Sequence, residues 1–487
     1  MILSSMQKIK PAYLLGIILA LAGFTHLWNA TGFPDVFFDE GVYLARAMNV
    51  LDGLGPQVGY FHDHPFFGQI FLAASLGLTG FPNSLHPSMN QDSIALLYLV
   101  PRILMGLLAV LDTFLVYLIA DTKYGKKIAL VASLLFAVMP ITWVLRSILL
   151  DSILLPFFLS SIFLALKMSN SNKYFLSLVS GIFLGLAIFT KIPVFTMIPL
   201  VAGLVYFHSG KDAKTLVLFL VPVLLIPLLW PLQAAETHQF DLWMKDVLWQ
   251  TQRHSTGLPY ISLLFYQMDP VLFVLGVSGM GYAILRRNYL VLFWIVPFVL
   301  FLLMIGYNQY FYWIPVLPVF CISSAILLID ILEKIRKKGT DKVIRIIVVS
   351  GIAVFGLAST IMVISTNLTN TEFAAAAYVL QNATNDTTVL ASPVYSWMLN
   401  YVFHKENVPN DYSYVLFEPI KTNKVLLVAD PHFLIDIPRG KQLAQIYNDS
   451  KTVATFDEDV SMYNTNGYPY SSIRLNLDGM HIEVKAK

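Results

Sequence analysis

The stretch FPDVFFDEGVYLARAMNVLDGLGPQVGYFHDHPFFGQ, residues 33–69, is the first long polar interruption in a chain that is otherwise mostly apolar. It follows one apolar segment and contains two clusters of ionisable side chains, Asp39-Glu40 and His62-Asp63-His64. Ionisable groups beside a membrane segment usually serve a function, and a carboxylate can act as a general base. This stretch therefore indicates a reaction centre at the surface of a bilayer.

The composition is typical of a polytopic α-helical membrane protein. Of 487 residues, 56% are hydrophobic and only 13% are charged, which is too apolar for an ordinary soluble protein. The formal net charge of +2 gives no basic surface for nucleic acid, so no nucleic-acid partner is predicted. Cys321 is the only cysteine, which excludes disulfides within the chain and thiolate metal clusters.

Eleven apolar runs are predicted to cross the bilayer as helices, since a crossing takes about 20 residues for roughly 30 Å of hydrocarbon. They lie near residues 12–29, 95–120, 128–145, 152–167, 174–190, 192–208, 215–232, 268–285, 289–306, 311–332 and 343–366. The run 66–78 is shorter, and counting it as a crossing would move the basic loop KYGKK outside. We therefore predict that it forms a re-entrant or interfacial helix.

Basic residues set the predicted orientation, because Lys and Arg accumulate on the cytoplasmic side. The loops on one side contain Lys123, Lys126, Lys127, Lys173, Lys211, Lys214, Arg286, Arg287 and the cluster 334–342. This places the N-terminus in the cytoplasm and residues 29–94 outside, in a multi-pass cell membrane or one like the endoplasmic reticulum. The first apolar run lacks a clear small-residue cleavage site and is predicted to remain as an anchor.

Residues 367–487 are predicted to form a separate extracytoplasmic α/β domain, after a transmembrane domain of residues 1–366. Hydropathy falls there, and the alternating runs TTVLASPVY, KVLLVAD and KTVATF are typical of strands. The glycosylation sequons at Asn367, Asn382, Asn385 and Asn448 are consistent with an external location.

Asp39 precedes a predicted amphipathic helix that ends at the Gly53 and Gly55 turn. It is either the N-cap of this helix or a catalytic carboxylate, and both roles are compatible. Tyr43 and Arg46 follow it by four and seven residues and so lie on the same helical face. They are candidates to orient the carboxylate or the substrate, although Arg46 could also only balance charge at the interface.

The second cluster, His62-Asp63-His64, stands directly before Pro65 and the short apolar run. Asp63 or His64 could cap that helix, or both could belong to the reaction centre. The spacing matches no standard zinc motif, so a metal would need ligands from distant segments. No cofactor is predicted with certainty, and a divalent metal is left open.

Later external turns contain further candidates. Arg146 and Asp151 interrupt WVLRSILLDSILLPFF, where they could serve function or form an ion pair with each other. Lys191 in FTKIPVF either snorkels to the interface or binds an anionic headgroup. Arg253 and His254 are candidates to bind a phosphate.

Two further features lie in or next to predicted spans. Asp112 lies inside a span and is expected to have a partner. Tyr310 belongs to the aromatic run NQYFYWIPVLP, whose side chains could form an interfacial belt or orient a substrate.

The order of these motifs resembles one superfamily. FFDEGVY, HDHPFFGQ, PRILMGLLAVLDTFLVYLIADTKYG, RSILLDSILLPFF, FTKIPVF and QYFYWIPVLP follow one another over roughly residues 12–330. Together they resemble the C-type (GT-C) membrane glycosyltransferases related to protein O-mannosyltransferases and aminoarabinose transferases. The chain departs from that pattern at Pro65-Phe66, where Pro-Pro is usual, and lacks the WWDYG motif of oligosaccharyltransferases.

The resemblance implies a GT-C fold and an inverting transferase. Such an enzyme moves one sugar from a polyprenyl-phosphate donor to a hydroxyl of a protein, glycan or lipid at the outer or lumenal face of a membrane. The implied and proposed catalytic residues are Asp39, Glu40, Asp63 and Asp151. The candidates for binding the donor phosphate are His64, Arg146, Lys191, Arg253 and His254, and the candidates for orienting substrate are Tyr43, Arg46 and Tyr310.

Two other functions remain open from the sequence. A transporter or lipid scramblase would usually concentrate its ionisable groups near mid-membrane and contain internal repeats, whereas the candidates here concentrate in external loops. A catalytically inactive relative that acts as a scaffold would keep the fold without the activity.

Overall fold

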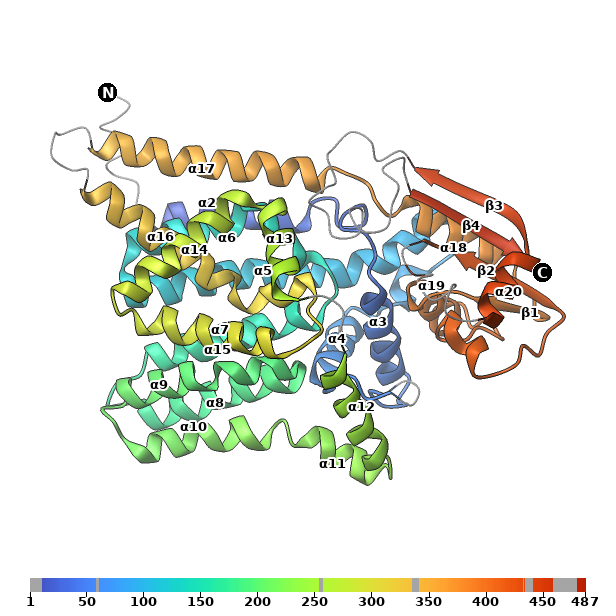
Figure 1. Cartoon of the computed structure of the whole chain (residues 1–487), viewed down its shortest axis with the longest axis horizontal. Helices are drawn as coiled ribbons and strands as arrows, with labels where there is room; N and C mark the ends of the chain where they lie inside the picture. The colour runs from blue at the N-terminus through green and yellow to red at the C-terminus, as the bar shows by residue number, and fades with distance from the viewer. Residues whose placement is uncertain are drawn as a thin grey trace.

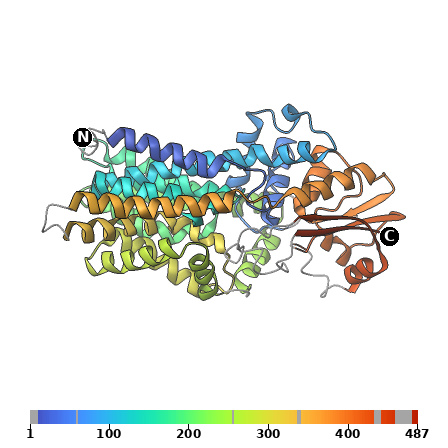
Figure 2. The same ribbon diagram turned by 90° about the horizontal axis from the view of Figure 1, so that it is seen from above.

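The computed structural model describes residues 11–57, 61–253, 257–334, 341–431, 433, 441–458 and 480–487. A bundle of long helices forms most of the molecule, and a four-stranded sheet with its own helices lies at one end of the bundle (Figure 1). The described parts of both predicted external segments, 29–94 and 367–487, lie at this same end (Figure 1, Figure 2).

A helix occurs at each of the eleven segments predicted to cross the membrane. The bundle helices are α2 (Pro11–Leu27), α5 (Gln91–Tyr124), α6 (Lys126–Val138), α7 (Leu150–Leu166), α8 (Lys173–Thr190), α9 (Ile198–His208), α10 (Ala213–Leu225), α14 (Pro270–Leu285), α15 (Tyr289–Met304), α16 (Leu317–Lys334) and α17 (Asp341–Ile364). The 3-10 turns η3 (Pro140–Arg146), η4 (Ile192–Met197) and η5 (Tyr310–Val316) adjoin α6, α9 and α16.

Local chemistry sets the ends of the longest helix, α5. Asn90 caps its N-terminus, since the side-chain oxygen accepts a hydrogen bond from Ser93 N at 2.8 Å. At the other end Gly125 has φ +85°, a conformation that glycine adopts without strain. The helix is thus 34 residues long, enough to cross a membrane and continue beyond it.

In the described part of the chain, five helices are long and apolar enough to cross a membrane. The number rises to seven if the bent pairs α6–η3 (68°) and α14–α15 (120°) each count as one span. Shorter apolar helices are α2, α4 (Phe67–Gly77), α7 and the segment 192–208. The positions of the predicted helices are therefore confirmed, whereas eleven crossings remain a prediction.

Shorter helices gather where the bundle meets the C-terminal part. α3 (Phe38–Leu51), α4 and α12 (Phe240–Gln252) lie there (Figure 1). The turn η2 (Asn83–Leu85) follows α4, α11 (Leu229–Glu236) precedes α12, and α13 (Leu258–Met268) follows it.

The C-terminal part is α/β, and the three predicted strands are confirmed. Its elements are α18 (Asn370–Asn382), β1 (Thr387–Leu390), α19 (Pro393–Trp397), the π-helical turn η6 (Met398–Val402), the 3-10 turn η7 (Tyr412–Leu416), β2 (Lys424–Ala429), α20 (Lys441–Asp449), β3 (Lys451–Glu458) and β4 (Met480–Ala486). The strand order is β1-β2-β4-β3, with β1 and β2 parallel and the other pairs antiparallel.

The C-terminal part packs directly on α3. A Cβ added to Gly41 of α3 would lie only 2.3 Å from the carbonyl carbon of Pro393, so α19 approaches the helix backbone as closely as glycine allows. Tyr98 of α5 fixes α19 further, because its hydroxyl donates to Val394 O at 2.8 Å and accepts from Trp397 Nε1 at 3.0 Å. Helix α3 is therefore held between the bundle and the C-terminal part.

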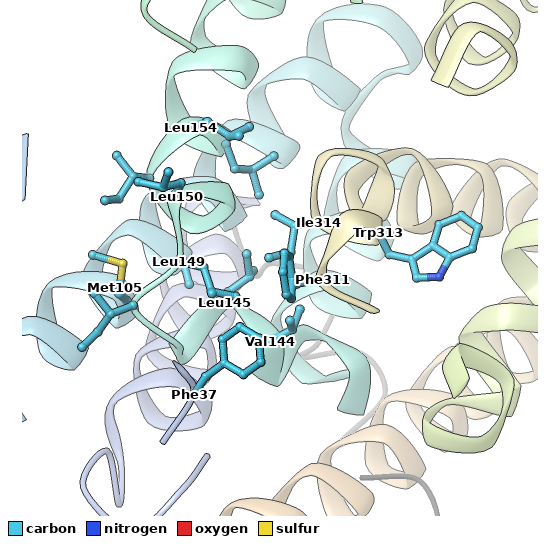
Figure 3. Packing of buried hydrophobic residues seen from close by; sticks show 14 of the residues in the cluster. Phe37, Met105, Val144, Leu145, Leu149, Leu150, Leu154, Phe311, Trp313 and Ile314 are labelled. Atoms are coloured by element: carbon cyan, nitrogen blue, oxygen red, sulfur yellow. The ribbon is translucent and has the colours of Figure 1, made fainter. Parts of the chain in front are cut away.

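Buried apolar side chains support the segments that carry the candidate residues. Figure 3 draws Leu149 and Leu150 at the start of α7, Phe37, which precedes α3, and Phe311 of η5 as members of one cluster of buried apolar side chains. All four side chains are at most 9% exposed. Because such cores are close-packed, these three chain segments have little freedom to move relative to one another.

Candidate active site

Asp39 lies in the first turn of α3 but is not its N-cap. The N-cap is Phe37, whose backbone N–H donates to Glu40 Oε2 at 2.9 Å. Asp39 itself is half-buried, and its Oδ2 accepts a hydrogen bond from the hydroxyl of Tyr43 at 3.4 Å, one helical turn later. The spacing of four residues thus brings Tyr43 to Asp39, as the helical pattern predicts.

Burial is the main cause of an unusual acidity at Asp39, whose pKa rises from 3.8 to about 6. The positive charges of Lys191 and Arg253 oppose this rise, and the negative charges of Asp63 and Asp151 add to it. Four charged groups from separate segments therefore act on one carboxylate. At neutral pH Asp39 is mostly ionised, and it is a stronger base than an exposed aspartate.

Asp63 is ion-paired with Arg46. Arg46 Nη1 lies 2.6 Å from Asp63 Oδ1, and the two side chains are 4% and 15% exposed. Burial alone would raise the pKa of Asp63, but the charge and the hydrogen bond of Arg46 oppose it, and the pKa lies below its ordinary value. Asp63 therefore stays ionised at neutral pH and is a poor base.

His64 follows Asp63 and receives support from it, because its backbone N–H donates to Asp63 Oδ1 at 2.9 Å. The imidazole ring lies 6.4 Å from the ring of Tyr43. Burial lowers the pKa of His64 to about 3, against the opposing charge of Asp63. His64 is therefore neutral at physiological pH and supplies no fixed positive charge.

Lys191 and Asp151 form a buried ion pair. Lys191 Nζ lies 2.5 Å from Asp151 Oδ2, and the side chains are only 3% and 5% exposed. The ammonium also lies 4.6 Å from the ring centre of Phe311 and 4.7 Å from that of Tyr312. Snorkelling of Lys191 to the interface and a pairing of Asp151 with Arg146 are therefore both wrong.

Arg253 at the end of α12 is held by aromatic rings. Its guanidinium carbon lies 3.5 Å from the ring centre of Tyr307 and 4.8 Å from that of Trp249, and Nη1 donates to Gln250 Oε1 at 3.0 Å. In the described part of the chain no carboxylate forms an ion pair with it. His254, the neighbouring candidate, lies outside the described residues.

Glu40 has a different environment from Asp39. It is fully buried and forms an ion pair with Arg102 of α5, with Nη2 and Oε2 2.8 Å apart. Its Oε1 also accepts a hydrogen bond from Ile148 N at 2.8 Å. These contacts join α3 to α5 and to the turn before α7, so Glu40 fixes the segments beside Asp39, and its catalytic role stays a prediction.

Two other candidates make contacts outside the charged cluster. Arg146 is buried, donates to the carbonyl of Trp28 and lies 5.5 Å from the ring centre of Phe33. Tyr310 packs its ring against Trp143 at 5.9 Å, and also against Phe37 and Phe311. Packing thus accounts for the described contacts of the Tyr310 ring.

The sequence interpretation missed Arg102, Tyr307 and Tyr312. Arg102 had a usable signal, because a charged residue inside a long apolar run needs a partner. The two tyrosines had none, since an aromatic ring beside a cation depends on packing between distant segments. Among the described residues, no group of three or more His, Cys, Asp or Glu side chains is placed to hold a metal ion.

The helical bundle, the acidic and basic cluster at its end and the small α/β part together define the architecture of a C-type membrane glycosyltransferase. The apo structure of ArnT from Cupriavidus metallidurans is similar, with a TM-score of 0.62 and 15% identity over 98% of this chain and 97% of that chain. The structure of ArnT from Cupriavidus metallidurans bound to undecaprenyl phosphate has a TM-score of 0.60 and 13% identity, again over 98% of this chain and 97% of that chain. The apo oligosaccharyltransferase of Archaeoglobus fulgidus has a TM-score of 0.57 and 13% identity, over 88% of this chain and 70% of that chain.

The family model of dolichyl-phosphate-mannose-protein mannosyltransferases matches residues 16–238, which include α3, α4 and the segment with Asp151 and Lys191. The family model covers a little under half of the chain, and the solved structures share the fold at low identity, so the chain is similar to C-type glycosyltransferases in fold and, over residues 16–238, in sequence. No curated protein sequence matches the chain.

Proposed function

We propose that this protein is an inverting glycosyltransferase that moves one sugar from a polyprenyl-phosphate donor to a hydroxyl acceptor at the outer or lumenal face. The acceptor class is a protein, a glycan or a lipid. The observation that carries the proposal is Asp39, a half-buried carboxylate with a pKa of about 6 that lies within the field of Lys191 and Arg253. A lipid-phosphate donor is supported by relatives of the same fold, namely ArnT bound to undecaprenyl phosphate and an archaeal oligosaccharyltransferase in complex with dolichol-phosphate.

In the proposed reaction Asp39 takes the proton from the acceptor hydroxyl. The hydroxyl oxygen forms a bond to the anomeric carbon while the bond from that carbon to the lipid phosphate breaks. The phosphate leaves with the electron pair, and a single displacement inverts the anomeric configuration. The ionised Asp39 suits this role, because a base works best when its pKa lies near the operating pH.

The donor phosphate is negatively charged in the bound donor as well as when it leaves, so it needs positive charge in a site shielded from water. Arg253 is the main candidate, because its guanidinium is fixed by two rings and has no ion-pair partner in the described part of the chain. Lys191 is a second cation that acts on Asp39, and Asp151 holds its ammonium in place. Asp151 and Asp63 then act as positioning residues, because each holds a cation.

The test compares complemented deletion strains by mass spectrometry of their glycans and glycolipids. Wild type and the control Asp52→Asn, an exposed position at the end of α3, should restore the missing sugar. Asp39→Asn should be inserted in the membrane but should not restore it. Full restoration by Asp39→Asn would exclude Asp39 as the base.

A second measurement separates a transferase from a scramblase. Vesicles that contain the purified protein are given polyprenyl-phosphate mannose and a membrane extract as the source of acceptors. A transferase consumes the donor and releases polyprenyl phosphate. Movement of intact donor between leaflets without consumption would favour the scramblase instead.

A further inference from the structure

Helix α12 exposes apolar side chains and buries an acidic one. Phe240, Met244 and Leu248 repeat every four residues and are exposed, between 40% and 51%, whereas the one buried side chain of the helix is Asp246 at 6%. Apolar residues normally face inward and a buried carboxylate is costly unless it is hydrogen-bonded. The three exposed apolar residues therefore do not hold α12 in place, whereas Trp243 packs against Trp230 of α11 and Asp246 is buried.

The buried carboxylate binds the loop that carries Asp63 and His64. Asp246 Oδ2 accepts a hydrogen bond from the backbone N–H of His62 at 2.7 Å. The ring of His62, itself fully buried, bonds through Nε2 to Gln239 Oε1 at 3.0 Å, just before α12 begins. Both contacts join segments that are more than 170 residues apart in the sequence.

A third contact lies one turn further along α12. The ring of Trp249 packs edge-on against Phe61 with the centres 5.4 Å apart. Residues 61 and 62 thus hold the start, middle and end of α12 at once. Together the contacts of His62 with Asp246 and Gln239, and of Phe61 with Trp249, form what we name the α12 clamp.

The helix that the clamp holds also leads to the reaction centre. Arg253 is the C-cap of α12, directly after Gln252, so the position of the helix sets where the backbone of Arg253 lies. Arg253 lies against Tyr307, and its charge acts on Asp39. The loop at the other side of the clamp places Asp63 beside Arg46, and His64 near Tyr43.

We infer that Asp246 and Gln239, acting through His62, position Arg253 for the phosphate of the lipid-linked donor and couple it to the loop that carries the acidic cluster. This inference rests on the proposed function for the role of Arg253. Asp246 is a positioning residue, since it reaches the donor only through the helix that it fixes. Loss of the clamp should weaken donor binding and leave the chemical step at Asp39 largely intact.

The experiment compares Asp246→Ala, Asp246→Asn and the control Asp241→Ala, an exposed acid on the same helix. Asparagine keeps an oxygen that can accept from His62 N, whereas alanine does not. The donor KM of Asp246→Ala should rise about tenfold or more with kcat within about threefold of wild type, as expected for lost ground-state binding. Asp246→Asn should stay within about threefold of wild type, and Asp241→Ala should not differ from it.

Two outcomes would overturn the inference. One is an unchanged donor KM in Asp246→Ala, and the other is a fall in kcat with KM unchanged. A variant that fails to fold would be recognised because it lacks a sharp thermal unfolding transition. In that case Gln239→Ala tests the clamp instead, because it removes the hydrogen bond between Gln239 and the ring of His62. Gln239→Ala should raise the donor KM in the same direction, and no change would count against the clamp.

A measurement without catalysis keeps this inference separate from the proposed function. Hydrogen exchange of α12 and of residues 61–64 should accelerate in Asp246→Ala but not in Asp241→Ala, with no substrate present. Binding of undecaprenyl phosphate should weaken in parallel. If wild type transfers no sugar but these two differences appear, the clamp stands and the proposed function fails. If neither difference appears, the clamp itself is refuted.

Discussion

Replacing Asp39 by asparagine should remove activity and yet stabilise the folded protein above pH 6. The pKa of Asp39 rises from 3.8 to about 6 because the folded protein buries the carboxylate. A raised pKa means that the folded state binds the proton more tightly than the unfolded state. The contribution of Asp39 to the free energy of unfolding is therefore fully present below about pH 4, and it is lost as the pH rises through 6.

The size of the effect follows from the shift. About two pKa units correspond to at most about 3 kcal/mol, at about 1.4 kcal/mol for each unit. Asp39 is only half-buried, so solvent screening reduces this bound. Asparagine cannot ionise and avoids the penalty, provided that its amide is accommodated beside Tyr43.

The assay is thermal unfolding of purified protein followed by tryptophan fluorescence between pH 4 and 8. The difference in thermal unfolding midpoint between Asp39→Asn and wild type should increase in favour of the variant from pH 4 to pH 7 and then level off. The control Asp52→Asn should show no such dependence. A difference that stays flat or falls with rising pH would refute the assigned burial and charge of Asp39.

The same pKa sets the pH dependence of catalysis. If Asp39 is the base, kcat/KM of wild type should fall below about pH 6, because protonated Asp39 cannot accept a proton. His64 has a pKa of about 3 and should add no further transition between pH 5 and 8. Steady-state rates at saturating acceptor measure this fall of kcat/KM at low pH. A constant kcat/KM down to pH 4.5 would contradict the role of Asp39 as the base.

Two structural contacts give further predictions. Glu40→Gln should destabilise the protein by about 3 kcal/mol or more, because it removes the negative charge that faces the buried guanidinium of Arg102; a thermal midpoint equal to that of wild type would contradict this. Gly41→Val should cost about 1–3 kcal/mol, since the new Cβ would meet Pro393 at 2.3 Å, and should make the C-terminal part more sensitive to protease. Gly16→Val is the control, as an added Cβ there meets nothing within 4 Å.

Hydropathy was sufficient to place the helices, but it could not decide how many cross the membrane. Each predicted segment contains a helix, because an apolar run in lipid must satisfy its own backbone hydrogen bonds. The turn between α14 and α15 falls at the predicted basic loop with Arg286 and Arg287, whereas the 68° bend between α6 and η3 lies inside the predicted span 128–145, where apolar composition alone does not indicate it. The short α4 has 11 residues, so its length agrees with an interfacial or re-entrant helix.

The candidate site was partly predictable for a related reason. Helical spacing correctly brought Tyr43 to Asp39, but it could not show that Arg46 turns to Asp63 instead. The principle that buried charges need partners predicted pairs without naming them, since the partner of Asp151 is 40 residues away and depends on the register between helices. For Asp112 no hydrogen-bond partner occurs among the described residues, so that expectation was not met.

The pairing of charges reduces a long set of candidates to two residues. Asp63 is paired with Arg46, and Asp151 with Lys191, so each of these pairs is close to neutral as a unit. Among the charged groups described around the centre, Asp39 and Arg253 remain, neither of them in an ion pair.

A base must have a free lone pair and a phosphate-binding group must have free N–H donors, and Asp39 and Arg253 meet these needs outside any described ion pair. Arg146 also has buried N–H groups without a partner, but its described contacts are with Trp28 and Phe33, away from the charged cluster.

The two ion pairs then have a structural role. Arg46 and Asp63 fix the loop before α4, and Lys191 and Asp151 lie against the rings of η5, so both pairs help to set the distance between Asp39 and Arg253. That distance must match the separation between the attacking hydroxyl and the leaving phosphate on opposite sides of one sugar carbon.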